Sequence, residues 1–522
     1  MAKVIVVGLD GATWDLLKPW ADRGELGSLK NLMESGVWGT LESIIPPLSG
    51  PAWASFLTGK NPGKHGVFGF GKLEDNSVRL YRSDDVRAKT LFSLLSEGNV
   101  RCVVIGLPLS FPPSGGFSGI MVSDFLYPSK AILPRSKRKY MEDYRVVPDF
   151  SLEGDELLGN MIETAKRQVE VAKRLFVEED WDFYTFYLGL TDTILHYYWK
   201  EVCNNTALGQ RAKEIYRVAD EFLGCVPNRI GAGTNLFVIP DHGFTSCPYK
   251  VNLNSLFMKR QLLRTRVEDA AKREDETLWG HVKGLAMKER GKKRRRRAVQ
   301  RPPLRNIPLK LAVYRVVKFV LQRVTQPLRH EKASPPIAID YNNSTAFVLP
   351  GCVSVHIRET DEKEREETTQ EIIRLLKRLK HKGQRVFDQV LPKDEVYSGA
   401  FAESSPDILL VPNRFFVASD LGAEVYTEYN QGASHDERGL FLAHGHGIRT
   451  SAAKLASFRI YDIVPTVLHI FGLPVPEDLD GRVLREIFEE GSEPAQSETA
   501  YQGAEDAKER LRKRIRRLNL TS

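Results

Sequence analysis

Residues 3–10 read Lys3-Val-Ile-Val-Val-Gly-Leu-Asp10, an apolar run that ends in a carboxylate. Short apolar runs rich in β-branched residues are typical of buried strands. Five more runs of this kind follow, at 102–105, 183–187, 235–239, 346–349 and 408–411. Segments with helical periodicity lie between the runs, at 155–177, 207–223 and 363–379. Strands that alternate with helices predict an α/β fold with a largely parallel central sheet.

The length and composition narrow the class of protein. The chain has 522 residues, enough for one large α/β domain with insertions or for two domains. Its 42% of hydrophobic and 27% of charged residues exclude wholesale disorder and a fibrous repeat. Five cysteines, an odd number without CxxC spacing, predict reduced thiols and a cytoplasmic location. We expect neither a signal peptide before the first strand nor a membrane-spanning segment.

The positive charge is concentrated in one segment. Residues 283–330 contain 16 Lys/Arg and one acid, which leaves the rest of the chain with a net charge of −7. We interpret residues 256–335 as a basic insertion with an amphipathic helix. It interrupts a catalytic domain of residues 1–485, and a polar, basic tail follows at 486–522.

The basic insertion is open to three interpretations. It is a solvated segment, or it contacts an anionic membrane surface through residues 283–330, or, less favoured, it binds nucleic acid. A membrane contact would leave the protein peripheral to the membrane. The sequence does not indicate the oligomeric state.

Three acids follow predicted strands: Asp10, Asp192 and Asp241. A single acid in such a place usually caps a helix or forms a turn. However, functional residues of parallel sheets gather where the strands end, so three such acids point to one site.

Histidines accompany two of these acids. Asp192 and His196 are four residues apart, which puts both on one helix face and lets them bind one metal ion, although surface helices also carry this pair. Asp241 and His242 follow a strand in succession, and we expect Gly243 to permit the bend that turns both toward one ion. Clustered carboxylates need cations to neutralise them, so the simplest interpretation is a two-metal hydrolytic site.

Ser49 precedes an apolar segment that has Pro51 in its first turn. Serine is a common helix N-cap with proline close behind, so capping alone is one interpretation. The other is catalytic, because a helix N-terminus attracts anions and a hydroxyl beside a dication is suited to attack phosphorus.

The motifs occur in a fixed order along the chain. They are Asp10-Gly, Ser49-Gly-Pro-Ala-Trp running into Thr58-Gly-Lys-Asn-Pro-Gly-Lys-His65-Gly, Asp192 with His196, Asp241-His242-Gly-Phe, and Ser434-His435 with Gly439. In this order the chain resembles the type I phosphodiesterase/nucleotide pyrophosphatase family of the alkaline phosphatase superfamily. The resemblance covers roughly residues 1–255 and 336–485. It implies an alkaline-phosphatase-like three-layer sandwich, in which helices flank a largely parallel sheet.

The resemblance also implies two divalent metal ions, most often zinc, with manganese or iron as alternatives. The implied ligands are Asp192, His196 and His435 for one ion, and Asp10, Asp241, His242 and the Ser49 oxygen for the other. Ser49 stands where the family usually has threonine. The implied reaction is in-line attack of Ser49 on a phosphodiester or pyrophosphate bond of a nucleotide-like or other phosphoester, with a covalent intermediate on that serine.

The chain departs from the family pattern at the phosphate-binding position. Eukaryotic members have an asparagine that binds the phosphoryl oxygens where this chain has Phe70. We expect the backbone amides after Ser49, beginning at Gly50, to replace it, with help from Lys60 or Lys64.

Three further histidines need an interpretation. His444 and His446 lie close to His435, but the His-x-x-x-Gly spacing of the family fits His435, which we therefore prefer as the third histidine ligand. We expect His65 to stabilise the loop after the helix that Ser49 begins.

Two alternative functions remain open. One is a phosphomonoesterase or phosphomutase of the same superfamily, which would share the metal ligands. The other is a non-catalytic relative associated with membrane or nucleic acid, against which the complete ligand set argues. A sulfatase is disfavoured because no arginine follows Ser49 in the sulfatase pattern.

Overall fold

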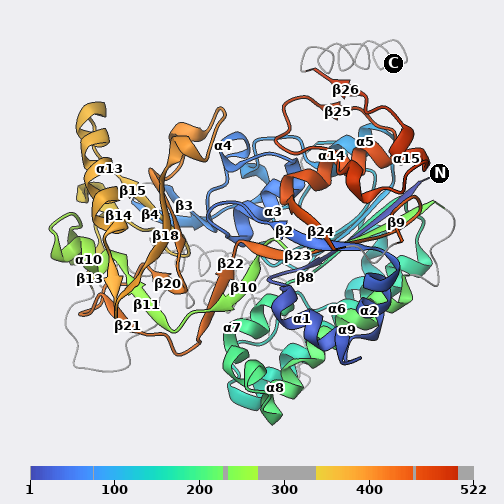
Figure 1. The fold of residues 1–522 in the computed structure, drawn as a ribbon, viewed down its shortest axis with the longest axis horizontal. Helices are drawn as coiled ribbons and strands as arrows, with labels where there is room; N and C mark the ends of the chain where they lie inside the picture. Colours follow the sequence, from blue (N-terminus) through green and yellow to red (C-terminus); the bar gives the residue numbers. More distant parts are fainter. Residues whose placement is uncertain are drawn as a thin grey trace, which may run out of the picture.

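The computed structural model describes residues 2–74, 76–113, 115–127, 129–226, 233–267, 337–450 and 454–503. Within these residues the central sheet has nine strands (Figure 1). Their spatial order is β24 (Lys454–Arg459), β2 (Val37–Glu42), β23 (Arg438–Gly445), β9 (Thr234–Ile239), β1 (Lys3–Leu9), β8 (Phe183–Leu188), β5 (Cys102–Ile105), β6 (Gly119–Val122) and β7 (Ile132–Leu133). All neighbouring pairs from β9 to β6 are parallel, while β23 and β7 run antiparallel to their neighbours. The largely parallel sheet is therefore confirmed.

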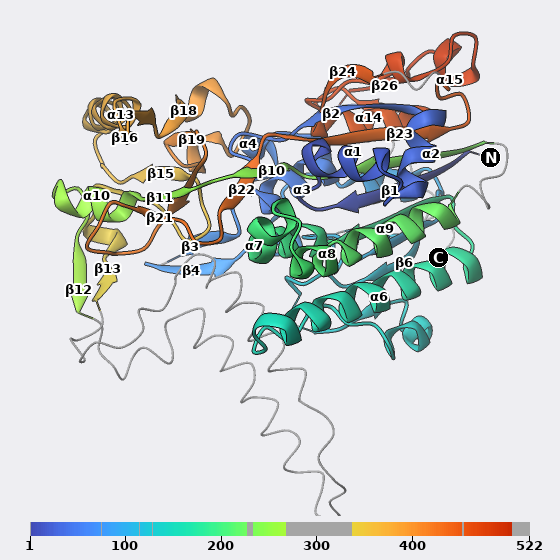
Figure 2. The same cartoon turned by 60° about the horizontal axis from the view of Figure 1, so that its bottom comes forward.

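The sheet is buried on both faces. In β1, Ile5 and Val7 pack into one hydrophobic core and Val4 and Val6 into the other, as the two-residue period of a strand requires. The first core is completed by helices α1 (Trp14–Asp22), α2 (Gly27–Ser35), α6 (Gly154–Glu178), α7 (Leu190–Cys203) and α9 (Glu214–Cys225). The second is completed by α3 (Ser49–Thr58), α5 (Leu91–Glu97) and α14 (Ile463–Ile470). Figure 2 shows the resulting helix–sheet–helix layers, so the predicted three-layer sandwich is confirmed.

A smaller lobe lies beside the sandwich, on the left of Figure 1. It has its own hydrophobic core, built on the helix α13 (Glu362–Lys377) and on antiparallel strands. These strands are β14 (Ala346–Phe347), β15 (Ser354–Ile357), β19 (Ile408–Pro412) and β18 (Phe387–Pro392). A three-stranded sheet, β20 (Phe415–Ala418), β11 (Tyr249–Asn252) and β21 (Tyr426–Glu428), belongs to the same side of the molecule. The runs at 346–349 and 408–411 are thus strands, but of this lobe and not of the central sheet.

Most predicted elements are found, with shifted ends. The predicted helix at 207–223 is two helices, α8 (Ala207–Ala212) and α9, because the chain turns at Lys213, which ends one and begins the other. The first residues of the predicted insertion, 256–267, form the end of α10 (Leu253–Lys259) and the strand β12 (Thr265–Val267). Its basic run and amphipathic helix, including residues 283–330, lie outside the described residues.

The predicted tail is folded where the structure describes it. Ile487 and Phe488 are buried in the second core, and β26 (Tyr501–Gln502) pairs with β25 (Val475–Pro476). The first part of the predicted tail thus packs against the sandwich. Among the described helices, none combines the length and the apolar composition that a membrane span requires.

Candidate active site

Three adjacent parallel strands deliver the predicted acids to one edge of the sheet. Asp10 follows β1, Asp192 lies in the first turn of α7 directly after β8, and Asp241 and His242 follow β9. Because β1 lies between β8 and β9 with matched directions, the carboxyl ends of the three strands meet. The predicted convergence of Asp10, Asp192 and Asp241 is thus present in the fold.

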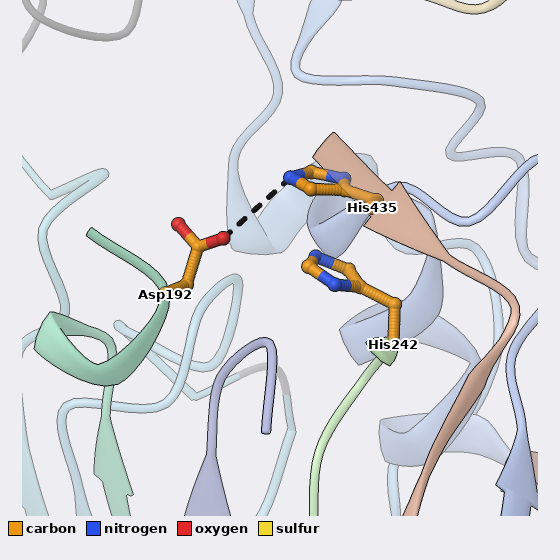
Figure 3. A group of neighbouring side chains, drawn as sticks. All are labelled: Asp192, His242 and His435. Atoms are coloured by element: carbon orange, nitrogen blue, oxygen red, sulfur yellow. Dashed lines mark ion pairs between the residues drawn. The ribbon is translucent and has the colours of Figure 1, made fainter. Parts of the chain in front are cut away.

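A two-stranded ribbon brings His435 to the same place. β10 (Gly243–Ser246) continues from His242 and pairs with β22 (Ala433–Asp436), so that Phe244 lies opposite His435. The imidazole rings of His242 and His435 stack with their centroids 3.7 Å apart and their planes at 18°. Figure 3 shows both rings facing Asp192. His444, the competing histidine, lies on β23, where its Nδ1 is 3.1 Å from the Ser35 carbonyl oxygen.

Gly243 has a different function from the one expected. The backbone does bend at Asp241 and His242, but Gly243 does not adopt a positive φ. A Cβ atom there would lie 2.0 Å from the carbonyl oxygen of Arg438. The glycine is needed for the close approach of β10 to β23, because any side chain would collide with that strand.

Backbone carbonyls orient two of the imidazoles. His242 Nδ1–H donates a hydrogen bond of 2.9 Å to the Gly243 carbonyl, and His435 Nδ1–H donates one of 2.9 Å to the Pro47 carbonyl. A carbonyl oxygen only accepts, so each Nδ1 carries the proton and each Nε2 presents its lone pair to the carboxylates. Histidines that bind metal ions are commonly fixed in this way.

The first cluster consists of Asp10, Asp241 and His242, and all three are buried. His242 Nε2 is 3.6 Å from Asp10 Oδ1 and 3.3 Å from Asp241 Oδ2. These two carboxylate oxygens are buried and receive no hydrogen bond from any described residue. Buried polar atoms are rarely left in this state, so the cluster fits a bound cation.

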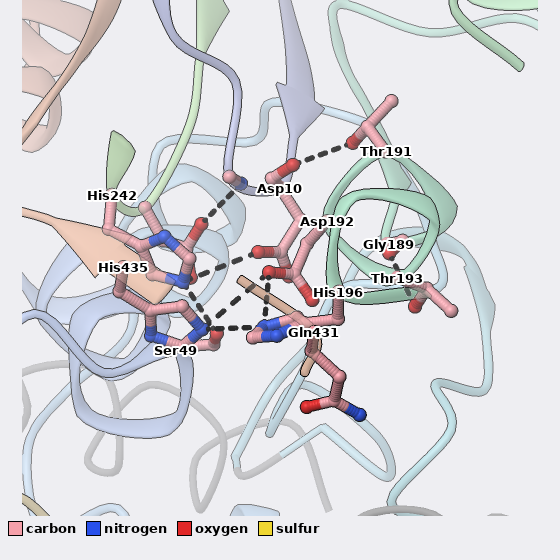
Figure 4. Close-up of polar contacts among 12 residues, drawn as sticks. Asp10, Ser49, Gly189, Thr191, Asp192, Thr193, His196, His242, Gln431 and His435 are labelled. Atoms are coloured by element: carbon pink, nitrogen blue, oxygen red, sulfur yellow. Dashed lines mark hydrogen bonds and ion pairs between the residues drawn. The ribbon is translucent and has the colours of Figure 1, made fainter. Parts of the chain in front are cut away.

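The second cluster contains Asp192 and His435, and His242 lies close enough to belong to it as well. Asp192 Oδ1 is 3.1 Å from His196 Nε2 and 3.6 Å from His435 Nε2, and the two Nε2 atoms are 3.1 Å apart. All six predicted protein ligands other than Ser49 therefore lie within one connected group. Figure 4 shows five of them, Asp10, Asp192, His196, His242 and His435. Imidazole nitrogens and carboxylate oxygens are the ligands that zinc and related divalent ions prefer.

The electrostatics of the group also fit cations. Burial, and then repulsion from Asp241 and Asp192, raises the pKa of Asp10 well above its usual value. Burial raises the pKa of Asp241 to about 7 and lowers the pKa of His435 well below its usual value. The protein alone thus disfavours charge here, whereas bound cations would favour ionised carboxylates and neutral imidazoles.

Ser49 lies beside the first cluster. It is the first residue of α3, Leu48 is the N-cap, and no side chain caps the helix. The Ser49 hydroxyl is instead 3.0 Å from His242 Nε2, and the residue is only 5% exposed (Figure 4). Since that nitrogen carries no proton, the hydroxyl donates to it. The capping interpretation therefore does not describe this serine.

Phe70 and the residues expected to bind phosphate in place of the family asparagine (Gly50 and Lys60 or Lys64) have different surroundings. Gly50 follows Ser49 in the first turn of α3, where a Cβ atom would lie 2.8 Å from the Gly69 carbonyl oxygen. Phe70 lines the cavity next to Ser49. Lys60 does not, because its ammonium group forms an ion pair with Asp478. Lys64 is similarly engaged, 2.6 Å from Asp480 Oδ1.

Sequence reasoning missed two residues that contact Asp10. The Tyr187 hydroxyl donates a hydrogen bond of 2.5 Å to Asp10 Oδ2, and the Thr191 hydroxyl donates one of 2.7 Å to the Asp10 carbonyl. Tyr187 is the penultimate residue of the apolar strand β8. A hydroxyl so close to the end of the strand was the feature of the sequence that could have indicated a contact with Asp10. Both contacts fix the orientation of Asp10.

A parallel sheet with clustered carboxylates, imidazoles and a buried serine at its carboxyl edge defines a metal-dependent hydrolase of the alkaline-phosphatase-like class. The model of the type I phosphodiesterase/nucleotide pyrophosphatase family matches residues 4–436, and the chain belongs to this family. The family hydrolyses phosphoester bonds and depends on metal ions, so the protein is a phosphoester hydrolase.

Solved structures share the fold at low sequence identity. The chain is similar to an inactive variant of murine ectonucleotide pyrophosphatase/phosphodiesterase 5 in complex with AMP, at 12% identity and a TM-score of 0.50, covering 94% of this chain and 100% of the other. It is also similar to phosphonoacetate hydrolase from Sinorhizobium meliloti 1021 in complex with phosphonoacetate, at 16% identity and a TM-score of 0.52, covering 89% and 94%. Among curated proteins, none matches the chain.

Proposed function

We propose that the protein hydrolyses phosphodiester or pyrophosphate bonds with Ser49 as the nucleophile and with two divalent ions, zinc being preferred. The observation that carries the proposal is the buried Ser49 hydroxyl beside the group of six carboxylate and imidazole side chains. Membership of the family supports the same reaction. The AMP and phosphonoacetate of the similar structures support a small phosphorus-containing substrate.

The proposed ligands divide into two sets. Asp10, Asp241, His242 and the Ser49 oxygen would hold one ion, and Asp192, His196 and His435 the other. When bound, the ions would neutralise the phosphoryl oxygens and lower the pKa of the serine hydroxyl and of the hydrolytic water.

The protein's own groups then account for the steps. Ser49 Oγ forms a bond to phosphorus, its proton leaves to solvent, and the bond from phosphorus to the departing oxygen breaks in line. The departing oxygen takes up a proton from solvent and leaves as an alcohol. Water then bonds to phosphorus and releases a proton while the serine–phosphorus bond breaks, and the serine oxygen takes up a proton, so that a diester and one water give an alcohol and a phosphomonoester. In the first turn of α3, Pro51 has no N–H group and the Ala52 N–H donates to the Leu48 carbonyl. The N–H groups of Ser49 and Gly50 precede the first bond of the helix and would donate to the phosphoryl oxygens.

Hydrolysis of bis(p-nitrophenyl) phosphate by the metal-loaded protein tests this function. Ser49→Ala should lower turnover at least about a thousandfold, because the nucleophile is lost. Ser49→Thr, which keeps a hydroxyl, should stay within about tenfold of the wild type. Elemental analysis should find the same metal content in all three proteins.

Two results would overturn the proposal. Undiminished turnover by Ser49→Ala would remove the serine from the mechanism. A preference for p-nitrophenyl phosphate over the diester would favour the alternative, a phosphomonoesterase or phosphomutase. The cytoplasmic location expected from the cysteines belongs to the proposal as well.

A further inference from the structure

The cavity beside Ser49 has two apolar walls. One wall comes from the sandwich and includes Phe125, Val147 and Phe150. The opposite wall comes from the smaller lobe and consists of Gly351, Cys352, Val353, Pro412, Phe415, Phe416 and Val417. The cavity volume is about 170 Å³. This volume also includes the space beside Ser49, Asp10 and Asp192 that a phosphoryl group would fill. Apolar protein cavities of about 150 Å³ hold a benzene molecule, so the arm that this cavity can take is small.

An aromatic surface leads from this cavity to the carboxylate group. The ring centroids of Phe70 and Phe125 are 6.4 Å apart, and those of Phe125 and Tyr187 are 6.5 Å apart with nearly parallel planes. Tyr187 in turn donates its hydroxyl hydrogen to Asp10. A group that lies against these rings is therefore next to the reacting phosphorus, within the reach of one ester bond.

The described residues of the cavity offer no lysine or arginine to a second anionic group. The titratable side chains among them are three aspartates, two histidines, two tyrosines and Cys352. The acid farthest from the catalytic group is Asp124, which is buried and accepts hydrogen bonds from the Leu126 and Tyr127 N–H groups. Lys60 and Lys64 are engaged with Asp478 and Asp480.

We propose that the cavity binds the uncharged apolar arm, aryl or short alkyl, of a monoanionic phosphodiester. This inference rests on the proposed function and names the substrate class for it. Burying an aryl arm should raise kcat/KM about tenfold to a hundredfold over a methyl arm, since burial removes a ring-sized apolar surface from water. A further phosphate or carboxylate on the substrate would meet acids and apolar walls and would therefore be disfavoured.

Three substrates with the same leaving group separate the effect of the second arm on kcat/KM from the effect of the leaving group. They are phenyl p-nitrophenyl phosphate, methyl p-nitrophenyl phosphate and p-nitrophenyl phosphate, which all release p-nitrophenolate. The wild type should prefer them in that order. Phe416→Ala, which removes a ring from the lobe wall, should reduce the phenyl-to-methyl ratio of kcat/KM about tenfold. Tyr501→Ala removes an exposed ring that does not line the cavity and should leave the ratio unchanged.

A charge substitution tests the second half of the inference. Val147→Lys adds a cation to the wall, and Val147→Met adds a chain of similar length without charge. The lysine variant should shift the monoester-to-diester ratio of kcat/KM about tenfold toward the monoester, while the methionine variant should not. Equal shifts in the two variants would overturn the charge argument.

A binding measurement without turnover distinguishes failure of the proposed reaction from failure of the arm assignment. Calorimetric titration of metal-loaded Ser49→Ala with phenyl methyl phosphate and with dimethyl phosphate reads the arm preference alone. If the wild type hydrolyses no diester but Ser49→Ala binds the phenyl ester at least about tenfold more tightly, the proposed reaction fails and the arm assignment stands. If the two esters bind equally, or if Phe416→Ala lowers both rates alike, the arm assignment is wrong.

Discussion

The edge of the central sheet and the smaller lobe face each other across the cavity, but they contribute different kinds of side chains. The sheet edge, with the β10–β22 ribbon, supplies the buried serine and every carboxylate and imidazole of the clusters. From the lobe, the described residues that line the cavity are apolar or contribute backbone. Among them, Phe416 is an aromatic ring that is only half-buried. In the two proposals above, bond cleavage and the choice of substrate arm belong to separate parts of the molecule.

The topology of each region explains this division. The ends of β1, β8 and β9 lead into turns and a helix start, where polar side chains and unpaired N–H groups occur naturally. The lobe instead lines the cavity with β20, which pairs in parallel with β11, with the residues just before β15 and with the last residue of β19. These residues are mostly apolar. Substitutions at the sheet edge should therefore abolish the reaction, and those in the lobe should change its selectivity.

The largest expected effect is the loss of metal and turnover on substitution of a carboxylate at the edge of the central sheet. Asp241→Asn should lower the metal content of the purified protein below two ions per chain and reduce diester turnover at least about a hundredfold, because an amide oxygen is a weaker ligand and leaves more positive charge unbalanced. Elemental analysis and kinetics on the same samples measure both. In the lobe, Asp420→Asn removes an acid that pairs with Lys250, and it should change neither quantity.

Two full ions per chain in Asp241→Asn would contradict its function as a ligand. Loss of metal in Asp420→Asn would contradict the division between the two regions, because the lobe would then affect the metal site.

A smaller effect concerns the junction of the two regions. The helix α4 (Pro62–His65) follows α3 and touches the lobe, where the Phe401 N–H donates a hydrogen bond of 2.8 Å to the Gly63 carbonyl. His65 is buried behind it, with Nε2 3.0 Å from the Ser55 hydroxyl and Nδ1 accepting a hydrogen bond from the Val67 N–H. These contacts fit the expected stabilisation of this loop by His65, which the next experiment tests.

Acid should weaken this junction through His65. Burial lowers the pKa of His65 from 6.5 to about 3. A depressed pKa means that the unfolded chain takes up the proton first, so stability is complete above pH 6.5 and is lost as the pH falls toward 3. At pH 5 this histidine should cost about 2 kcal/mol of unfolding free energy.

Urea unfolding at pH 8 and pH 5 measures this effect. The wild type should lose about 2 kcal/mol more than His65→Gln between these two pH values. The exposed His446 provides the control, and His446→Gln should behave like the wild type. An equal pH dependence in His65→Gln and the wild type would show that His65 is not the group responsible.

The sequence predicts the sheet side much better than the lobe. Strand ends are local features, so the apolar run before Asp10 was enough to indicate where a catalytic carboxylate lies. The pairing of β10 with β22 confirms that His435, and not His444, reaches this edge. Two strands of the lobe were predicted, at 346–349 and 408–411, but not its separation from the central sheet. Phe125 and Phe416, which line one cavity, are almost 300 positions apart. Only long-range packing brings such residues to one cavity.

The smallest expected effect concerns Lys60, which the sequence suggested as a phosphate-binding residue. Its ammonium group pairs instead with Asp478 in the segment after α14, away from the lining of the cavity. Lys60→Ala should therefore change KM and kcat for the diester less than about twofold and lower the unfolding free energy by about 0.5 kcal/mol, as is usual for a partly exposed ion pair. Asp478→Ala, which removes the partner, should have the same small effect on stability. A tenfold rise in KM in Lys60→Ala alone would mean that the lysine leaves Asp478 to bind substrate, and the cavity would then contain the cation that excludes an uncharged-arm preference.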